Sequence, residues 1–276
     1  MPLQFNPVKL FAGSGTTVLA QKIAESYGKP LGDVSLSRFS DGEFQPHFNE
    51  SVRGCDIFLI QSTTPPTENL MELLLMIDAA KRASAHYITV VVPYFGFARQ
   101  DRKDKPRVAI GAKLIANLIT AAGAHRIMTM DLHAAQIQGF FDIPIDNFRA
   151  MPLIVDYFKK KKLEDVVIVS PDHGGAVRAR KMGDVMGYDI AIIDKHRPAP
   201  NVSEVMGLVG NVKGKSAIII DDMIDTAGTI TKAVEALFEA GAKDVIIAAT
   251  HAVFSGPAVE RLRDSKAVEI VVTDSL

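Results

Sequence analysis

Cysteine and tryptophan are almost missing from this 276-residue sequence, which has one of the former and none of the latter. With Cys55 alone, no intrachain disulfide can form, and a zinc site made of several cysteines is excluded. Charge of one sign is not in excess either, because 31 Lys and Arg stand against 32 Asp and Glu, for a net charge of -1. The overall charge therefore indicates no nucleic-acid or anionic-membrane partner.

Long apolar runs are also absent. None reaches the length of a membrane span, and residues 1–10 lack the cationic and apolar segments of a secretory signal. Together with the lone cysteine, this favours a reducing, cytoplasmic setting. The 47% hydrophobic and 23% charged residues are those of a soluble globular protein. The length predicts about two domains or one large one.

Apolar runs of strand length alternate with helical stretches along the whole chain, which predicts the α/β class with mainly parallel sheets flanked by helices. The expected strands are residues 57–61, 88–93, 127–130, 166–170, 217–220 and 245–249. The helices lie between them, with residues 112–122 and 230–240 showing the clearest apolar spacing.

A repeat relates the two halves of the chain. Gly123-Ala124 recurs 118 positions later as Gly241-Ala242, and His133-Ala134 recurs at the same interval as His251-Ala252. Both pairs flank an expected strand in the same way. We therefore expect two similar α/β domains, 1–146 and 147–276, joined where prolines interrupt the pattern at residues 144–152.

The stretch 217–231 is the most informative part of the sequence. An apolar run is followed by Asp221 and Asp222, then by the small-residue segment 225–229, then by the apolar spacing of a helix. This places a loop at the carboxyl end of a buried strand, where open α/β sheets bind their ligands. An ordinary acidic turn between strand and helix is the alternative.

The residues of this loop suit a phosphosugar. Small residues let backbone N–H groups approach a phosphate, and the helix N-terminus adds partial positive charge. Carboxylates repel phosphate, but they accept hydrogen bonds from vicinal hydroxyls and attract Mg²⁺. Ribose 5-phosphate combines a phosphate with such hydroxyls.

Two clusters in the first half suit a polyphosphate nucleotide. Residues 38–43 surround an Asp-Gly turn with an aromatic ring and charges, and residues 94–103 carry Arg99, Arg102 and Lys103 beyond an expected strand. Gln100, between the cations, can bind the edge of a nucleobase. Taken alone, residues 38–43 favour a plain surface turn, and residues 94–103 are equally compatible with a flexible basic loop.

Two further clusters suggest a metal and a mobile basic loop. His133 follows one expected strand, and Asp172 follows another beside two glycines, so both are candidates for a Mg²⁺ environment. Residues 194–201 form a Pro-rich loop with Lys195 and Arg197, and such loops deliver positive charge to a phosphoryl transition state. A structural histidine and an exposed basic loop are the alternatives.

Together, these motifs resemble those of one family, the class I ribose-phosphate diphosphokinases. The matching segments are residues 38–43, 94–103, 131–142, 170–180, 194–197, 221–229 and 255–258. The resemblance implies two domains of the type I phosphoribosyltransferase-like fold. It also implies transfer of the diphosphoryl group of Mg-ATP to the 1-hydroxyl of ribose 5-phosphate, for nucleotide biosynthesis. A non-catalytic subunit of the same family and a nucleobase phosphoribosyltransferase are the alternatives.

The resemblance also implies residue roles. It places ATP at Arg99 and Gln100, together with Phe39, Asp41, Gly42 and Glu43 of a neighbouring subunit, within a hexamer built from dimers. It assigns Mg²⁺ to His133 and Asp172 and catalysis to Lys195 and Arg197. Ribose 5-phosphate is implied to bind Arg197, Asp221, Asp222, Asp225, Thr226, Ala227, Gly228 and Thr229.

Two departures from the family pattern stand out. Ala109, Ile110 and Gly111 occupy the place of Pro-Ile followed by Ser or Thr, next to the basic loop that includes Arg99. The sequence also stops at Leu276, before the segment that in the family supplies serines of an allosteric phosphate site. The resemblance therefore leaves phosphate activation and ADP inhibition of this chain open.

Overall fold

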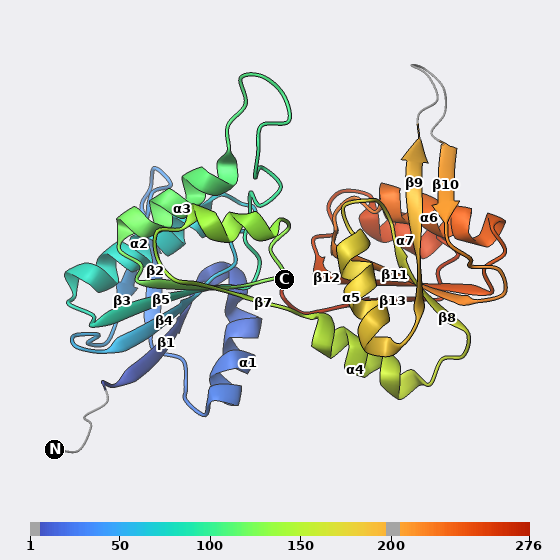
Figure 1. Cartoon of the computed structure of the whole chain (residues 1–276). Helices are drawn as coiled ribbons and strands as arrows, with labels where there is room; N and C mark the ends of the chain where they lie inside the picture. Colours follow the sequence, from blue (N-terminus) through green and yellow to red (C-terminus); the bar gives the residue numbers. More distant parts are fainter. Residues whose placement is uncertain (1–5, 197–204) are drawn as a thin grey trace. The chain divides into compact units, whose positions relative to one another are not determined.

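A computed structural model describes residues 6–196 and 205–276 (Figure 1). The chain divides into two compact units. One comprises the chain up to Phe148 together with Ser275 and Leu276, and the other comprises Arg149–Asp274. Among the described residues, no helix is long and apolar enough to cross a membrane.

The first unit is built on a five-stranded parallel sheet with the order β1-β4-β5-β6-β7. Its strands are β1 (Val8–Ala12), β4 (Asp56–Ile60), β5 (Tyr87–Val92), β6 (Arg126–Met130) and β7 (Ile145–Phe148). A separate antiparallel hairpin consists of β2 (Val34–Arg38) and β3 (Phe44–Phe48). The helices are α1 (Thr17–Tyr27), α2 (Glu68–Arg82) and α3 (Gly111–Ala122), with the 3-10 turns η1 (Ser14–Thr16) and η2 (Ala135–Phe140).

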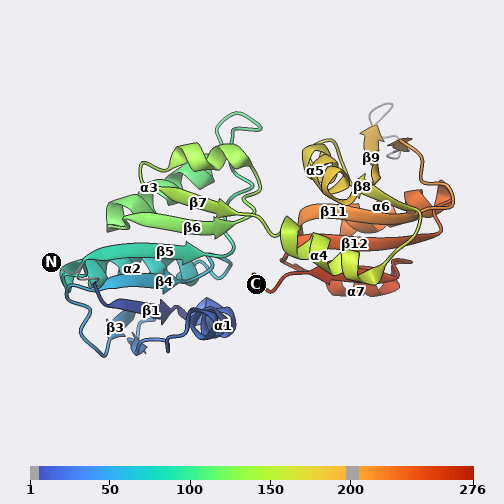
Figure 2. The same ribbon diagram turned by 60° about the horizontal axis from the view of Figure 1, so that its bottom comes forward.

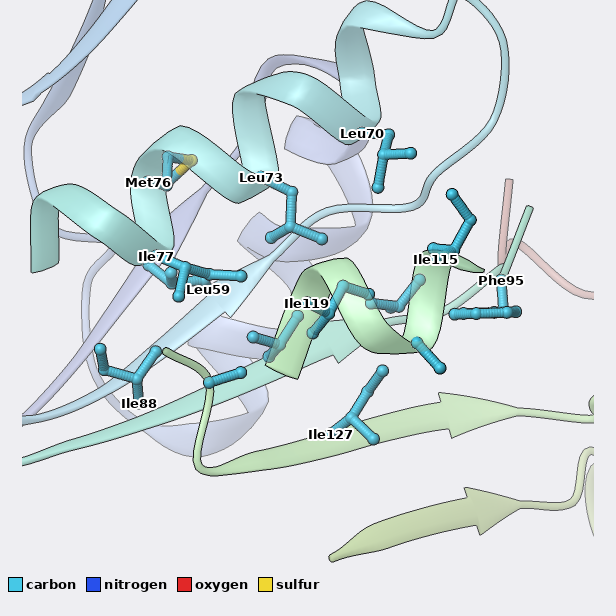
Figure 3. Packing of buried hydrophobic residues seen from close by; sticks show 14 of the residues in the cluster. Leu59, Leu70, Leu73, Met76, Ile77, Ile88, Phe95, Ile115, Ile119 and Ile127 are labelled. Atoms are coloured by element: carbon cyan, nitrogen blue, oxygen red, sulfur yellow. The ribbon is translucent and has the colours of Figure 1, made fainter. Parts of the chain in front are cut away.

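Helices α2 and α3 cover one face of this sheet, and α1 covers the other (Figures 1 and 2). Figure 3 shows the larger core, between the sheet and helices α2 and α3, where Leu73 and Ile77 of α2 and Ile119 of α3 pack with Leu59 and Ile127 of the strands. Cys55 lies in the same core with only 5% of its surface exposed. Burying one leucine, isoleucine or methionine side chain in this core stabilises the unit by roughly 1.5–3 kcal/mol.

The second unit has a six-stranded sheet with the order β10-β9-β8-β11-β12-β13, in which only β10 is antiparallel to its neighbour. Its strands are β8 (Val166–Ser170), β9 (Asp189–His196), β10 (Val205–Val209), β11 (Ser216–Ile224), β12 (Asp244–Ala252) and β13 (Glu269–Val272). Its helices are α4 (Met151–Lys161), α5 (Ala176–Met186), α6 (Gly228–Glu239) and α7 (Ala258–Asp264).

Strand order places the candidate site of this unit. The chain leaves β8 for β9 on one side and later returns to β11 on the other side, so the loops after β8 and β11 diverge at a topological switch point. Helices α6 and α7 bury Ile230, Val234 and Leu262 on one face of the sheet. The predicted α/β class with mainly parallel sheets is confirmed.

Candidate functional site

The acid pair lies within strand β11. The strand continues through Asp221 and Asp222 to Ile224, four residues beyond the expected end at Ile220, and it pairs with β12 over this extension. Asp222 is buried and Asp221 is half-buried. The backbone N–H of Asp222 donates to Oδ1 of Asp221 at 2.8 Å, which fixes one carboxylate by its neighbour's backbone.

Arg178 of helix α5 reaches both carboxylates, a contact that the sequence pattern did not predict. Its Nη1 donates to Oδ1 of Asp221 at 3.0 Å, and its Nη2 lies 3.4 Å from Oδ1 of Asp222. Burial raises the pKa of Asp221 to about 8, the charge of Asp222 adds to the rise, and the Arg178 guanidinium opposes it. The site therefore holds a carboxyl group that titrates near neutral pH.

This raised pKa predicts a pH-dependent stability difference for Asp221→Asn. The folded-state pKa of about 8 exceeds the usual 3.8, so between these values the folded chain keeps a proton that the unfolded chain has lost. Stability contributed by Asp221 is thus lost as pH rises through this window. Because asparagine does not ionise, the variant should gain stability relative to the wild type from about pH 4 to pH 8, by at least about 1.4 kcal/mol, the value of one pKa unit.

Thermal or urea unfolding of both proteins across this pH range measures the difference. A difference in unfolding free energy that stays constant with pH would contradict the raised pKa of Asp221.

The small-residue loop follows β11 directly. Helix α6 begins at Gly228, two residues earlier than expected, and it is preceded by Ala227 in a left-handed backbone conformation (φ 60°). This conformation is uncommon outside glycine and turns the chain sharply into the helix. The backbone N–H groups of the first helical turn lack intrahelical acceptors and suit an anion.

Contacts from the C-terminal part of the unit support this loop. The backbone N–H of Ser255 donates to the carbonyl of Asp225 at 3.0 Å, and Nη1 of Arg261 donates to the carbonyl of Thr226, also at 3.0 Å. A Cβ atom placed on Gly228 would lie 3.1 Å from that Nη1, so the glycine leaves room for the guanidinium. Arg261 is a second site residue that the sequence pattern did not predict.

The loop after β8 contains Asp172. Its Oδ1 accepts the backbone N–H of Gly175 at 2.9 Å, and its carbonyl accepts the hydroxyl of Ser170 at 2.6 Å. Next to it, Nε2 of His173 lies 2.9 Å from Oδ1 of Asp194 on strand β9. The loop is thereby connected to the strand that leads to the expected basic loop.

The expected catalytic residues lie at the edge of what the structure describes. Lys195 belongs to β9, with its Cα opposite that of Met206 in β10, while its side chain is not described. Arg197 lies outside the described residues. The roles of both remain predictions.

In the first unit, the expected adenine-binding residues form the turn of the β2-β3 hairpin. The backbone N–H of Phe39 donates to the carbonyl of Glu43 at 2.8 Å, and that of Glu43 donates to Oδ1 of Asp41 at 3.0 Å. Gly42 has a φ of 99°, which favours glycine. Phe39 is 54% exposed, so the turn presents an aromatic ring to its surroundings.

The basic loop after β5 is attached to the loop after β4. The backbone N–H of Gly96 donates to Oγ1 of Thr63 at 2.7 Å, and a Cβ atom at Gly96 would lie only 2.1 Å from the Thr63 carbonyl oxygen. This close approach requires glycine and directs the chain toward Arg99 and Gln100, which are both exposed. A Cβ atom at Gly111 would likewise lie 2.5 Å from Oε1 of Gln100, so this departure from the family pattern makes room for the carboxamide.

His133 is exposed in the segment between β6 and η2, and Nε2 of Gln136 in η2 donates to Oδ2 of Asp101 of the basic loop at 2.7 Å. Among the described residues, no group of three or more His, Cys, Asp and Glu side chains could hold a metal ion. Mg²⁺ usually binds one or two carboxylates and completes its shell with water and substrate phosphates. The oriented carboxylate of Asp172 fits this mode of binding.

Comparisons with known proteins agree on one family. Residues 8–123 match the N-terminal domain of ribose phosphate pyrophosphokinase, and residues 141–274 match the phosphoribosyl transferase domain. The ribose-phosphate pyrophosphokinase of Bacillus caldolyticus is 61% identical over 270 residues, which cover 98% of this chain and 86% of that protein. The corresponding protein of Bacillus subtilis (strain 168) is 58% identical, with 98% and 85% covered.

A solved structure gives the same result. The crystal structure of phosphoribosylpyrophosphate synthetase from Mycobacterium smegmatis matches with a TM-score of 0.93 and 46% sequence identity. The match covers 98% of this chain and 90% of that one.

Proposed function

The chain belongs to the ribose-phosphate pyrophosphokinase family, so it is a diphosphotransferase, and we propose how its residues share the reaction. It transfers the diphosphoryl group of ATP to the 1-hydroxyl of ribose 5-phosphate, giving 5-phosphoribosyl 1-diphosphate and AMP for nucleotide biosynthesis. The observation that carries the assignment of the sugar site is the acid pair of β11 next to the N-terminus of α6.

Ribose 5-phosphate binds to the second unit. Its phosphate accepts hydrogen bonds from the backbone N–H groups of Thr226, Ala227, Gly228 and Thr229, where the helix dipole favours an anion. Its hydroxyls donate to Asp221, Asp222 and Asp225. Because Arg178 already neutralises part of the charge on the acid pair, these carboxylates suit hydroxyl donors better than a metal ion.

ATP binds to residues of the first unit. Arg99 contacts its phosphates, and Gln100 contacts the nucleotide. Phe39, Asp41, Gly42 and Glu43 hold the adenine of the ATP bound by an adjoining chain, so the active assembly is a homo-oligomer, a hexamer built from dimers. The exposed ring of Phe39 on a rigid turn supports this arrangement.

His133 and Asp172 are the residues that hold Mg²⁺, which would neutralise phosphate charge when bound. The anomeric hydroxyl attacks the β-phosphorus, and no covalent enzyme intermediate is required. Lys195 and Arg197 stabilise the charge on the transferred group and on the departing AMP, so catalysis is mostly positioning and charge neutralisation.

The proposed function is tested by AMP formation from ATP in the presence of Mg²⁺, with and without ribose 5-phosphate. AMP should appear only when ribose 5-phosphate is present. A non-catalytic subunit would form no AMP. A nucleobase phosphoribosyltransferase would instead consume 5-phosphoribosyl 1-diphosphate when a nucleobase is added.

Phe39→Ala should raise the KM for ATP about tenfold or more, because stacking of an aromatic ring on a base contributes roughly 1–3 kcal/mol. The fold should be little affected, since Phe39 is exposed. Tyr27→Ala, which removes another exposed ring of the same unit, is the matched control and should leave this KM unchanged. Sedimentation velocity, which follows dissociation of the oligomer on dilution, is run alongside the AMP assay, and activity should fall in parallel with dissociation. A fully active monomer would rule out a shared ATP site.

A further inference from the structure

Arg178 joins two elements of the second unit at the acid pair. It is the third residue of helix α5, and its guanidinium spans Asp221 and Asp222 on β11. Its side chain is only 21% exposed, compared with 25% for Asp221 and 6% for Asp222. Ion pairs this sheltered from water are screened less than pairs on the surface.

The geometry of this contact is that of an orienting group. Oδ1 of Asp221 receives two donors, Nη1 of Arg178 and the backbone N–H of Asp222, so this oxygen has a defined direction. Arginine keeps its charge at every physiological pH and presents its N–H groups in a rigid fork, which a lysine cannot reproduce.

The charges explain why the acid pair needs such a partner. Two adjacent carboxylates removed from water repel each other, and the pair tends to take up a proton. The pKa of Asp221 is raised by burial and by Asp222, and Arg178 is the cation that lowers it. Arg178 therefore limits the repulsion within the pair, and the carboxyl oxygens that it fixes in place remain acceptors for hydroxyl groups.

We propose that Arg178 is a positioning residue for the sugar. It orients the carboxyl groups of Asp221 and Asp222, so that their oxygens accept hydrogen bonds from the hydroxyls of ribose 5-phosphate. This inference depends on the proposed role of the acid pair. Arg178 acts through the carboxylates, not by contact with the reacting atoms.

Steady-state kinetics of the full chain test this role. Arg178→Ala should raise the KM for ribose 5-phosphate about ten- to a hundredfold, the scale of losing one hydrogen bond between charged groups, while the KM for ATP stays nearly unchanged. Arg178→Lys should fall between this variant and the wild type. Added methylguanidinium, far below concentrations that unfold proteins, should lower the raised KM of Arg178→Ala.

Arg180→Ala is the matched control, because it removes the same charge from an exposed position on the same helix. It should leave the KM for ribose 5-phosphate unchanged. If Arg178→Ala keeps the wild-type KM, or if only its thermal midpoint falls, the contact is structural and the inference is wrong. A raised KM that methylguanidinium does not lower would also overturn it. Failure of the proposed function is recognised separately, by a wild type that forms no AMP in response to ribose 5-phosphate.

Discussion

Lys195→Ala should lower kcat and kcat/KM together by at least about a hundredfold, the scale of losing one electrostatic stabiliser of a transition state. The KM values for ATP and ribose 5-phosphate should be nearly unaltered. The physical reason is that charge on the transferred diphosphoryl group and on AMP develops as the bond breaks. A cation that serves mainly this charge contributes little to binding of the ground state.

The place of Lys195 in the fold agrees with such a role. It lies in β9, directly after Asp194, which contacts His173 beside Asp172. Steady-state kinetics of AMP formation measure the effect, and Lys243→Ala, an exposed lysine of the same unit, is the control for loss of charge. Normal turnover with only a raised KM would make Lys195 a binding residue.

Asp225→Ala and Asp221→Ala should each weaken the use of ribose 5-phosphate far more than the use of ATP. The loss of a hydrogen bond to a charged group is worth roughly 1.5–3 kcal/mol, or about ten- to a hundredfold in the KM for ribose 5-phosphate. Asp221 lies near the end of β11 and Asp225 lies in the loop that leads into α6, where the phosphate and the hydroxyls of one ligand can be bound together.

The control for these two variants is Asp184→Ala, which removes an exposed carboxylate from helix α5 and should leave the kinetics unchanged. Titration of ribose 5-phosphate at saturating ATP, followed by the reverse titration, separates the two substrates. Wild-type kinetics for ribose 5-phosphate in both Asp225→Ala and Asp221→Ala would refute the sugar site.

The sequence predicted strand bounds correctly where the whole strand consists of apolar or small side chains. The run of five apolar or small residues predicted for 166–170 is β8, with the same bounds. In contrast, β11 was predicted to end at Ile220, because the pattern turns polar at Asp221. Backbone pairing with β12 continues to Ile224 opposite Ala252, since ladder hydrogen bonds do not depend on side-chain polarity.

The internal repeat predicted where equivalent strands begin, but not how exposed the equivalent histidines are. Strand β12 begins 118 residues after β6, as the repeat requires. Yet His133 is exposed beyond the end of β6, whereas His251 lies within β12 and is 2% exposed. The sheets also differ in strand order at their first two strands, because the connections that determine this order lie outside the repeated segment.

Contacts between distant segments could not be predicted from the sequence. Arg178 is 43 residues from Asp221, and Arg261 is 35 residues from Thr226, so no local spacing reveals either contact. The place of Arg178 within the matching segment 170–180 was the only signal for this residue. The residue roles assigned from the family resemblance stay predictions that the kinetic experiments test.

Cys55, buried in the core of the first unit, makes this chain a convenient background for spectroscopic labelling. Thiol reagents modify cysteines according to their accessibility and thiolate fraction, and this thiol is almost inaccessible to solvent. A fluorophore will therefore report selectively on a cysteine introduced at the exposed Ser40 in the hairpin turn. Its emission and anisotropy would follow the approach of a second chain directly, without relying on catalytic turnover.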